Sequence, residues 1–461
     1  TKDGCISMEK MTLAEIIDAV DGSFGYPSDV FVDNISTDTR TIKEGSVFVA
    51  IKGEKSDGHD YAVKAMGLGA VAVISERAVD GAKCIIVDST RKALLDLAAY
   101  YRSKFQIPVV GITGSVGKTT TKEMIALVVA EQFNTLKTEG NHNNEIGVPW
   151  TLFGLNNEHK AAVIEMGMNH EGEISRLSLC SQPTIAVITN IGMSHIENLG
   201  SQENILKAKM EILDGADYNA PLILSYDDKM LKNVEIHEGR KAVYYSVKKK
   251  DCDVYATDIC DNGEAVSFTV NYPEGKIQAK INCMGEHNVK NALAAFCVGL
   301  ELGISSEKIV AGIEKFKPDG LRQNIVKSRG RTFIVDCYNA SPDSMKSALK
   351  VLSKIEVKGN GRRIAVLADM LELGDMSKKL HRLVGEYVAT AECDMLLCFG
   401  ENSAYYIEGA VKKGFEAESY RHFDSREQLA EYLKKALQEN DAVLFKGSRG
   451  MKLEEVIKAL D

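Results

Sequence analysis

A glycine-rich segment followed by a lysine and two threonines has the residue types and spacing of a phosphate-binding site. Between an apolar, β-rich run and a helical one the chain reads Thr113, Gly114, Ser115, Val116, Gly117, Lys118, Thr119 and Thr120. Glycines let successive backbone N–H groups face an anion, and the start of the following helix adds positive charge. Lys118 could reach the β- and γ-phosphates, while the Thr119 hydroxyl suits a magnesium ion. The segment therefore predicts nucleotide binding.

The spacing departs from the usual phosphate-loop pattern. Gly111 stands one residue too early, and Ile112 occupies the position of the first glycine. A glycine-rich turn without a ligand is the alternative interpretation. The strand predicted before the segment and the helix predicted after it favour the nucleotide site.

Two polar side chains further along the chain follow apolar runs that are typical of strands. Glu165 ends the run Ala161–Ile164, and His195 comes shortly after the run Ile185–Thr189. Ligands of parallel sheets bind beyond the carboxyl ends of the strands, so both side chains are expected near the phosphate loop. Either residue alone could be a solvated or structural side chain. Together they predict a metal role.

Lys209 lies on the apolar face of a predicted helix, Gln202–Leu213. It shares that face with Ile205 and Ile212, whereas Lys207 falls on the opposite, solvated face. Such a lysine can extend its ammonium group to water. If it is buried instead, its pKa falls, and the neutral amine can react with carbon dioxide to give a carbamate, an anionic magnesium ligand. The residues alone leave both alternatives open.

The predicted elements that position these groups alternate between strand and helix. The alternation from residue 107 onward indicates a mostly parallel sheet, extended by antiparallel strand pairs within Asp251–Cys283. A second alternation begins near Thr332, and short strands and helices precede Phe105. A chain of 461 residues exceeds one hydrophobic core, so we expect an α/β protein of two or three domains.

Composition excludes several classes of protein. With 44% hydrophobic and 26% charged residues, the chain is neither disordered throughout nor rich enough in apolar runs to insert into a membrane. The net charge of −9 gives no basic field for nucleic acid. Residues Thr1 to Lys10 lack the apolar core of a signal peptide, and the ten cysteines, Cys5 among them, form no C-x2-C pair. We expect a cytoplasmic protein without structural zinc.

Motifs along essentially the whole chain resemble those of the Mur ligase family of peptidoglycan synthesis. In the middle of the chain these motifs are Thr113–Thr120, Gly140–Pro149, Glu165–His170, Asn190–His195, Lys207–Ile212 and Gly285–Ala292. The flanking stretches are similar to those of the family member that adds D-alanyl-D-alanine; they are Thr37–Arg40, Val47–Asp60, Val335–Met345, Leu367–Gly374 and Phe445–Arg449.

The resemblance implies three α/β domains. They are an N-terminal uridine-nucleotide-binding domain over 1–106, a central P-loop ATPase domain with a mostly parallel sheet over 107–318, and a C-terminal Rossmann-like ligase domain over 319–461. It also implies ATP, two Mg²⁺ ions and a carbamoylated lysine at Lys209. Thr119, Glu165, His195 and the Lys209 carbamate would hold the metal ions, and Lys118 would act beside them.

The resemblance further assigns ligand contacts and substrates. Asn288 and Asn291 would face the adenine, and Arg322 and Asp336 would contact the nucleotide when the C-terminal domain closes. The substrates would be UDP-N-acetylmuramoyl-tripeptide and D-alanyl-D-alanine, joined through an acyl phosphate.

Candidate substrate contacts are Asp38, Arg40, Lys52, His59, Thr138, Asn141 and Asn143 for the UDP-sugar, and Asn339 and Ser341 for the dipeptide. His381 could be structural or functional. We expect a monomer without nucleic-acid or membrane partners.

Two other functions are compatible with parts of the pattern. A related ligase could add a single amino acid to a UDP-muramoyl peptide, or glutamate to folate, although a folate enzyme should lack the N-terminal uridine-domain signature. A nucleotide switch would use the phosphate loop without ligation. Glu165, His195 and Lys209 together argue against a switch, which needs no second metal beside an acceptor carboxylate.

Overall fold

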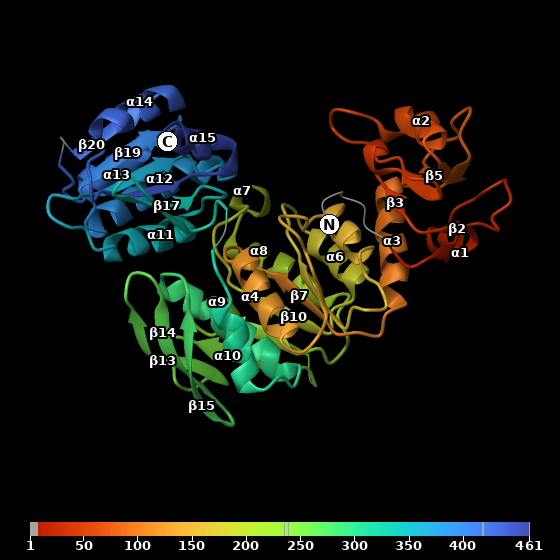
Figure 1. The fold of residues 1–461 in the computed structure, drawn as a ribbon, viewed down its shortest axis with the longest axis horizontal. Helices are drawn as coiled ribbons and strands as arrows, with labels where there is room; N and C mark the ends of the chain where they lie inside the picture. Colours follow the sequence, from red (N-terminus) through yellow and green to blue (C-terminus); the bar gives the residue numbers. More distant parts are fainter. Residues whose placement is uncertain (1–7, 235, 238, 319, 417–418, 461) are drawn as a thin grey trace.

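The computed structural model describes residues 8–234, 236, 237, 239–318, 320–416 and 419–460. Three α/β domains follow one another along the chain, and the central domain lies between the other two (Figure 1). Cys5, the first seven residues of the predicted polar N-terminus and residue 319, the predicted start of the third domain, lie outside the described residues. The boundaries after residues 106 and 318 stay predictions.

The N-terminal domain is built on a parallel sheet in sequence order. Its strands are β3 (Ile35–Ser36), β4 (Ser46–Val49), β5 (Ala70–Ser75) and β6 (Cys84–Ile86). The short strands β1 (Met11–Thr12) and β2 (Phe31–Val32) pair antiparallel beside it, and the helices are α1 (Leu13–Ala19), α2 (Ala62–Gly67) and α3 (Thr90–Ser103).

Helix α3 joins this domain to the central one. Its Arg102 is only 6% exposed, and the guanidinium donates hydrogen bonds to the carbonyls of Phe105 and, across the interface, Ser181. A buried N–H group that loses its acceptor costs free energy, so these hydrogen bonds hold the segments that contain Phe105 and Ser181 close to Arg102. Arg102 therefore ties the two domains together at this point.

The central domain contains a nine-stranded sheet in the order β15-β14-β13-β12-β11-β10-β7-β9-β8. The parallel strands are β7 (Val109–Thr113), β8 (Thr135–Lys137), β9 (Ala161–Glu165), β10 (Ile185–Ile188), β11 (Leu222–Ser225), β12 (Ala242–Ser246) and β13 (Val254–Asp261). Strands β14 (Val266–Tyr272) and β15 (Gly275–Ile281) then pair antiparallel, which confirms the predicted extension.

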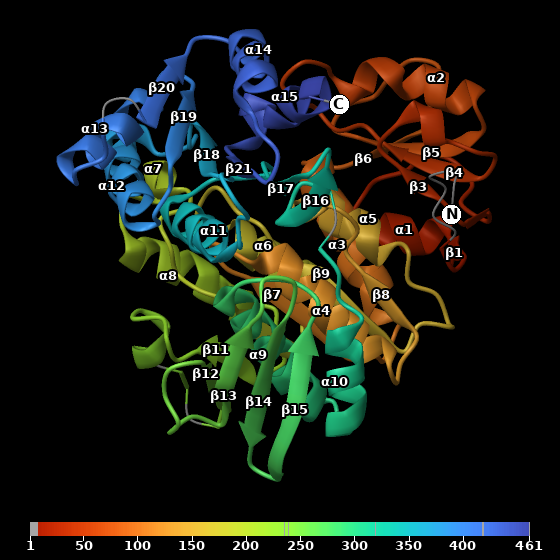
Figure 2. The same ribbon diagram turned by 60° about the vertical axis from the view of Figure 1, so that its left-hand side comes forward.

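Helices cover both faces of this sheet (Figure 2). Val110 and Ile112 of β7 pack into one core cluster with residues of α4 (Lys118–Ala130), α9 (Glu286–Glu301) and α10 (Ser306–Glu314). Val109 joins the cluster on the other face with α5 (Gly147–Leu152), α6 (Glu173–Ser181) and α8 (Gln202–Met210). Because alternate residues of β7 enter opposite cores, this central strand is largely apolar on both faces.

The C-terminal domain has a six-stranded sheet in the order β16-β17-β21-β18-β19-β20. Only β16 (Asn324–Ser328) is antiparallel to its neighbour; the others are β17 (Arg331–Asp336), β18 (Arg363–Ala368), β19 (Met395–Phe399), β20 (Tyr420–Phe423) and β21 (Ala442–Lys446). The helices are α11 (Pro342–Lys354), α12 (Ser377–Thr390), α13 (Ala404–Lys412), α14 (Arg426–Ala436) and α15 (Leu453–Leu460). The predicted second α/β alternation is confirmed.

Among the described helices, none is both long and apolar enough to cross a membrane. The nine cysteines within the described residues are all free, and only Cys252 and Cys260 are not buried.

Candidate active site

The phosphate loop connects β7 to α4, and two of its glycines have positive φ. Gly114 has φ 151°, and a Cβ there would lie 1.9 Å from Thr189 Oγ1. Gly117 has φ 83° at the N-cap of α4, where no side chain caps the helix. Gly111, by contrast, lies within β7, where a Cβ would lie 2.9 Å from Pro183 Cγ. The unusual glycine spacing therefore reflects packing in the strand.

The residues that follow β10 shape this loop. Val116 N–H donates to Asn190 Oδ1 over 2.9 Å, and its carbonyl accepts from Thr189 Oγ1 over 2.8 Å. Lys118 Nζ donates to the Gly114 carbonyl over 2.8 Å, which keeps the ammonium over the loop. The pKa of Lys118 is lowered, chiefly by burial.

Glu165 ends β9 beside the loop and is 1% exposed. Its Oε1 accepts from Asn143 Nδ2 over 2.8 Å and from Thr119 Oγ1 over 3.3 Å. Its Oε2 is buried without a hydrogen bond, and Lys122 Nζ lies 3.9 Å away. A buried carboxylate oxygen without a partner is costly, and a cation would satisfy it. The oxygen donors here suit magnesium.

Thr138 and Lys122 support Glu165 from behind. Thr138 is fully buried; its hydroxyl accepts from the Glu165 N–H over 3.0 Å, and its carbonyl accepts from Lys122 Nζ over 2.7 Å. Thr138 therefore has no exposed atom for the predicted UDP-sugar contact, and here it positions Glu165. Sequence reasoning missed Lys122, although its place one helical turn after Lys118 is a usable signal.

His195 and Lys209 reach the same edge of the sheet. His195 begins the short helix α7 (Ile196–Leu199), lines the cavity and has a side chain that is 16% exposed. Lys209 on α8 is 1% exposed, and burial, together with the charge of Lys118, lowers its pKa well below the ordinary value. Its ammonium group therefore does not extend to water. Lys207 is exposed, as predicted, and it pairs with Glu171.

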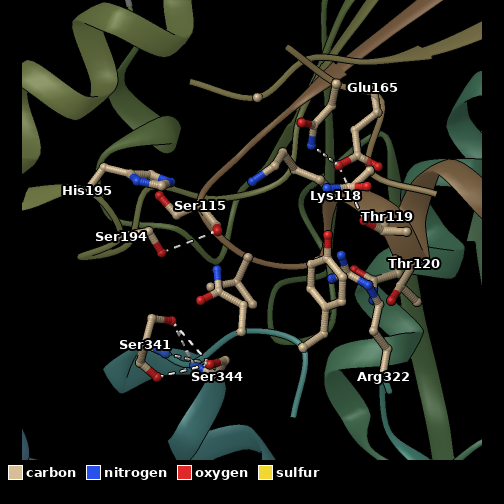
Figure 3. Close-up of a pocket in the computed structure, with 18 of the residues that line it drawn as sticks. Ser115, Lys118, Thr119, Thr120, Glu165, Ser194, His195, Arg322, Ser341 and Ser344 are labelled. Atoms are coloured by element: carbon tan, nitrogen blue, oxygen red, sulfur yellow. Dashed lines mark hydrogen bonds between the residues drawn. The ribbon is translucent and has the colours of Figure 1, made fainter. Parts of the chain in front are cut away.

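The C-terminal domain closes the site from the opposite side (Figure 3). The Arg322 guanidinium lies 3.8 Å from the centre of the Tyr338 ring, a cation–π contact. Asp336 Oδ2 accepts from Lys446 Nζ over 2.7 Å, and Lys446 also donates to the Asn339 carbonyl over 3.1 Å. Lys446 thus links the end of β17 to the segment that contains Asn339.

A cavity of about 320 Å³ lies between these groups. The predicted residues that line it are Ser115, Val116, Gly117, Lys118, Thr119, Thr120, Asn141, Asn143, Glu165, His195, Asn288, Asn291, Arg322, Asp336, Asn339 and Ser341. Thr113, Gly114 and Lys209 lie outside that lining, although the Gly114 carbonyl accepts a hydrogen bond from Lys118 and the charge of Lys118 acts on Lys209.

The two predicted adenine-facing asparagines belong to a hydrogen-bonded chain. Asn291 accepts from Thr121 Oγ1 and donates to Asn288 Oδ1, each over 3.1 Å. Asn288 Nδ2 in turn donates to Gln323 Oε1 over 3.1 Å, and His287 Nε2 lies 2.8 Å from the same oxygen. Sequence reasoning did not single out His287 and Gln323, because only the tertiary structure brings α9 to the start of β16.

The four candidates of the N-terminal domain are not among the residues that line this cavity. Asp38 and Arg40 form an ion pair with each other, which lowers the pKa of Asp38, and Lys52 is exposed. His59 is 2% exposed; its Nδ1 contacts Asp57 at 2.5 Å, and its Nε2 accepts from a backbone N–H over 3.1 Å. With both nitrogens engaged, His59 fixes its loop.

His381 has a structural role. It is fully buried on α12; its Nε2 accepts from the Met370 N–H over 3.1 Å, and its Nδ1 lies 2.8 Å from the Ser377 carbonyl. The side chain thus ties the segment after β18 to the start of α12.

The chain is similar to known proteins over almost its entire length. Residues 31–109 match the model of the Mur ligase family, catalytic domain; residues 112–299 match the Mur ligase middle domain; and residues 321–449 match the Mur ligase, glutamate ligase domain. The UDP-N-acetylmuramoyl-tripeptide--D-alanyl-D-alanine ligase of Bacillus subtilis (strain 168) is 37% identical over 460 residues, which cover 98% of this chain and 99% of the relative.

Solved structures agree with this similarity. The crystal structure of MurF from Acinetobacter baumannii superposes with a TM-score of 0.91 at 33% identity, covering 99% of both chains. The structure of MurF ligase from Thermotoga maritima in complex with ADP gives a TM-score of 0.83 at 28% identity, covering 93% of this chain and 96% of that one. This chain therefore belongs to the Mur ligase family.

Proposed function

We propose that this protein is an ATP-dependent ligase that joins D-alanyl-D-alanine to UDP-N-acetylmuramoyl-tripeptide in peptidoglycan precursor synthesis. The observation that carries the proposal is that Lys118 of the phosphate loop, the buried carboxylate of Glu165 and Arg322 of the C-terminal domain line one cavity. Relatives named for this reaction match the chain over nearly its full length.

The reaction has two steps. A carboxylate oxygen of the tripeptide attacks the γ-phosphorus of ATP, so that an acyl phosphate forms and ADP leaves. The amine of D-alanyl-D-alanine then attacks the acyl carbon, the C–O bond to phosphate breaks, and the amine proton is lost as the amide forms. Such phosphoryl transfer depends mainly on positioning and charge stabilisation. Lys118 and the loop N–H groups would hold the phosphates, and Arg322 would approach them from the C-terminal domain.

Magnesium fits the residues that surround the loop. The Thr119 hydroxyl and the unpartnered Glu165 Oε2 would hold one ion, and His195 with a carbamate on Lys209 would hold a second. When bound, magnesium neutralises negative charge on the phosphates and on the acceptor carboxylate. Asn143 keeps Glu165 oriented through its hydrogen bond to Oε1.

The environment of Lys209 favours carbamate formation. Burial and the charge of Lys118 lower its pKa, so that the neutral amine is accessible at lower pH than for a solvated lysine. The amine nitrogen bonds to the carbon of CO₂ and releases a proton, which leaves an anionic carbamate. That anion would offset the positive charge of Lys118.

The remaining predicted contacts would be made to the two substrates that the reaction joins. Asp38, Arg40 and Lys52 lie on the N-terminal domain and would contact the UDP-sugar, as would Asn141 and Asn143 at the cavity. Asn339 and Ser341 would face the dipeptide from the C-terminal domain. We further propose that the enzyme acts as a monomer in the cytoplasm, where free cysteines such as the nine described here are usual.

Hydroxylamine trapping tests the acyl-phosphate step. With ATP and UDP-N-acetylmuramoyl-tripeptide but without dipeptide, hydroxylamine should convert the activated carboxyl group into a hydroxamate that mass spectrometry detects. Adding D-alanyl-D-alanine should divert the intermediate and reduce the hydroxamate. ATP hydrolysis that needs no UDP-substrate and yields no hydroxamate would instead support the nucleotide-switch alternative.

A further inference from the structure

A segment of the C-terminal domain docks against His195 of the central domain. Glu372 Oε2 lies 2.9 Å from His195 Nδ1. Two residues further along each chain segment, Gly374 is so close to Glu197 that a Cβ on Gly374 would lie 2.9 Å from Glu197 Cγ. The docking thus involves both an ion-pair contact and close packing, and it brings an acidic side chain to a predicted metal ligand.

Both members of the ion pair have an uncommon backbone conformation. His195 and Glu372 each have φ 62°, in the left-handed region that residues other than glycine seldom adopt. A conformation of this kind costs free energy and persists where the surrounding structure requires it. The contact between the two domains therefore joins two residues whose backbone conformations are both uncommon.

The segment that contains Glu372 is fixed within its own domain. The Met370 N–H donates to His381 Nε2 over 3.1 Å, and the Leu371 N–H donates to Ser448 Oγ over 2.9 Å. Leu373, on the other side of Glu372, is 3% exposed. The loop that carries Glu372 is therefore held in place within the C-terminal domain. Its carboxylate contacts His195 because that domain docks on the central one.

We propose that Glu372 is a positioning residue for His195. Its Oε2 lies within ion-pair distance of Nδ1, a buried atom that makes no hydrogen bond of good geometry, and a proton held on Nδ1 by this carboxylate would leave the Nε2 lone pair free for a divalent cation in the cavity. Histidine ligands commonly donate their second ring N–H to a carboxylate, which fixes the tautomer and the orientation of the ring. Docking of the C-terminal domain thereby fixes the orientation of one metal ligand, His195. This inference rests on the proposed function, because it requires His195 to bind the metal ion.

Mn²⁺ binding to the full-length protein tests the role of Glu372 without measuring turnover. Electron paramagnetic resonance would follow Mn²⁺ titrated in the presence of a saturating, non-hydrolysable ATP analogue. Loss of such a supporting carboxylate typically weakens metal affinity by about 10- to 100-fold, so we expect Glu372→Ala to weaken the more weakly held Mn²⁺ within that range. Glu372→Gln keeps an acceptor oxygen and should have an intermediate effect.

Asp375→Asn is the matched control, since Asp375 is an exposed carboxylate three residues further on the same turn. It should bind Mn²⁺ as the unmodified protein does. The Glu372 side chain is 59% exposed, so both of its variants should fold, which circular dichroism would check. Affinity in Glu372→Ala within twofold of the unmodified protein would overturn the proposal.

The variant His195→Ala separates this proposal from the proposed function. If Glu372 acts through His195, adding Glu372→Ala to His195→Ala should weaken Mn²⁺ binding no further. Unchanged Mn²⁺ affinity in His195→Ala would contradict the metal site itself. A weakened His195→Ala beside an unaffected Glu372→Ala would contradict the role of Glu372 alone.

Discussion

The Lys446 ammonium donates a hydrogen bond to Asp336 Oδ2 over 2.7 Å, and the two residues are register partners on the parallel strands β21 and β17. Their side chains are 2% and 11% exposed. A parallel sheet thus holds a buried ion pair at the carboxyl ends of its strands, where the C-terminal domain faces the phosphate loop.

Removing Lys446 should destabilise the C-terminal domain. Lys446→Met leaves the Asp336 carboxylate buried without its partner, and breaking such a pair costs about 3–5 kcal/mol of unfolding free energy. Urea unfolding followed by circular dichroism measures the change. Lys452→Met is the control, because the side chain of Lys452 is 57% exposed, and it should cost less than about 1 kcal/mol. Equal stability of the two variants would contradict the role assigned to the pair.

Lys209→Ala should lose nearly all ligase activity, because it removes the side chain that would form the carbamate. Short carboxylates such as acetate or formate should restore part of the activity by supplying an anionic oxygen ligand. Phosphate release under saturating substrates measures both effects. Lys207→Ala on the opposite face of α8 should stay active, since the Lys207 side chain is 72% exposed. Full activity of Lys209→Ala without any added carboxylate would rule out the carbamate.

The buried amine of Lys209 should also make stability depend on pH. Its folded-state pKa is well below the unfolded value near 10.5, so between the two values the unfolded chain binds more protons. Stability should therefore rise with pH through that window, by at most about 1.4 kcal/mol per pH unit, relative to Lys209→Met. Denaturant unfolding at several pH values in CO₂-depleted buffer measures the difference. If the difference in unfolding free energy between the unmodified protein and Lys209→Met were the same at every pH, the pKa of Lys209 would not be lowered by folding.

Ion pairs between the central and C-terminal domains should help to hold them together. Lys350 Nζ lies 3.0 Å from Glu286, and Lys354 Nζ lies 3.2 Å from Asp261. Partly exposed pairs contribute about 0.2–1 kcal/mol each and are screened by salt. The double variant Lys350→Ala/Lys354→Ala should therefore raise the radius of gyration of the nucleotide-free protein in X-ray scattering.

Adding nucleotide and UDP-substrate together should restore compaction in that variant, because both ligands bridge the domains. The matched control is Lys434→Ala/Lys435→Ala on α14, where Lys435 pairs with Glu431 of its own helix. A radius of gyration that neither the interdomain variant nor the ligands change would argue against closure.

Much of the fold was predictable because buried parallel strands appear as short apolar runs. The run Ala161–Ile164 corresponds to β9, and the phosphate loop and Glu165 follow their strands as expected. The predicted helix Gln202–Leu213 is α8 followed by a 3₁₀ turn over Glu211–Leu213, a common tightening at a helix end that sequence periodicity does not reveal.

The residues that sequence reasoning missed depend on partners far along the chain. Lys446 pairs with Asp336 across strands separated by more than a hundred residues, and Glu372 meets His195 only where two domains dock. The resemblance makes Thr138 a candidate substrate contact, but the pairing of β8 with β9 places its hydroxyl on the Glu165 N–H. Tertiary contacts of this kind leave no local pattern.

Phosphate release with a panel of amines tests the proposed ligation most directly. The full-length protein would be incubated with ATP, Mg²⁺ and UDP-N-acetylmuramoyl-tripeptide, and then with D-alanyl-D-alanine, D-alanine, L-alanine or glutamate. We predict stoichiometric release of phosphate and formation of the pentapeptide product with D-alanyl-D-alanine only. Release that depends on a single amino acid, or on no amine at all, would contradict the proposed function.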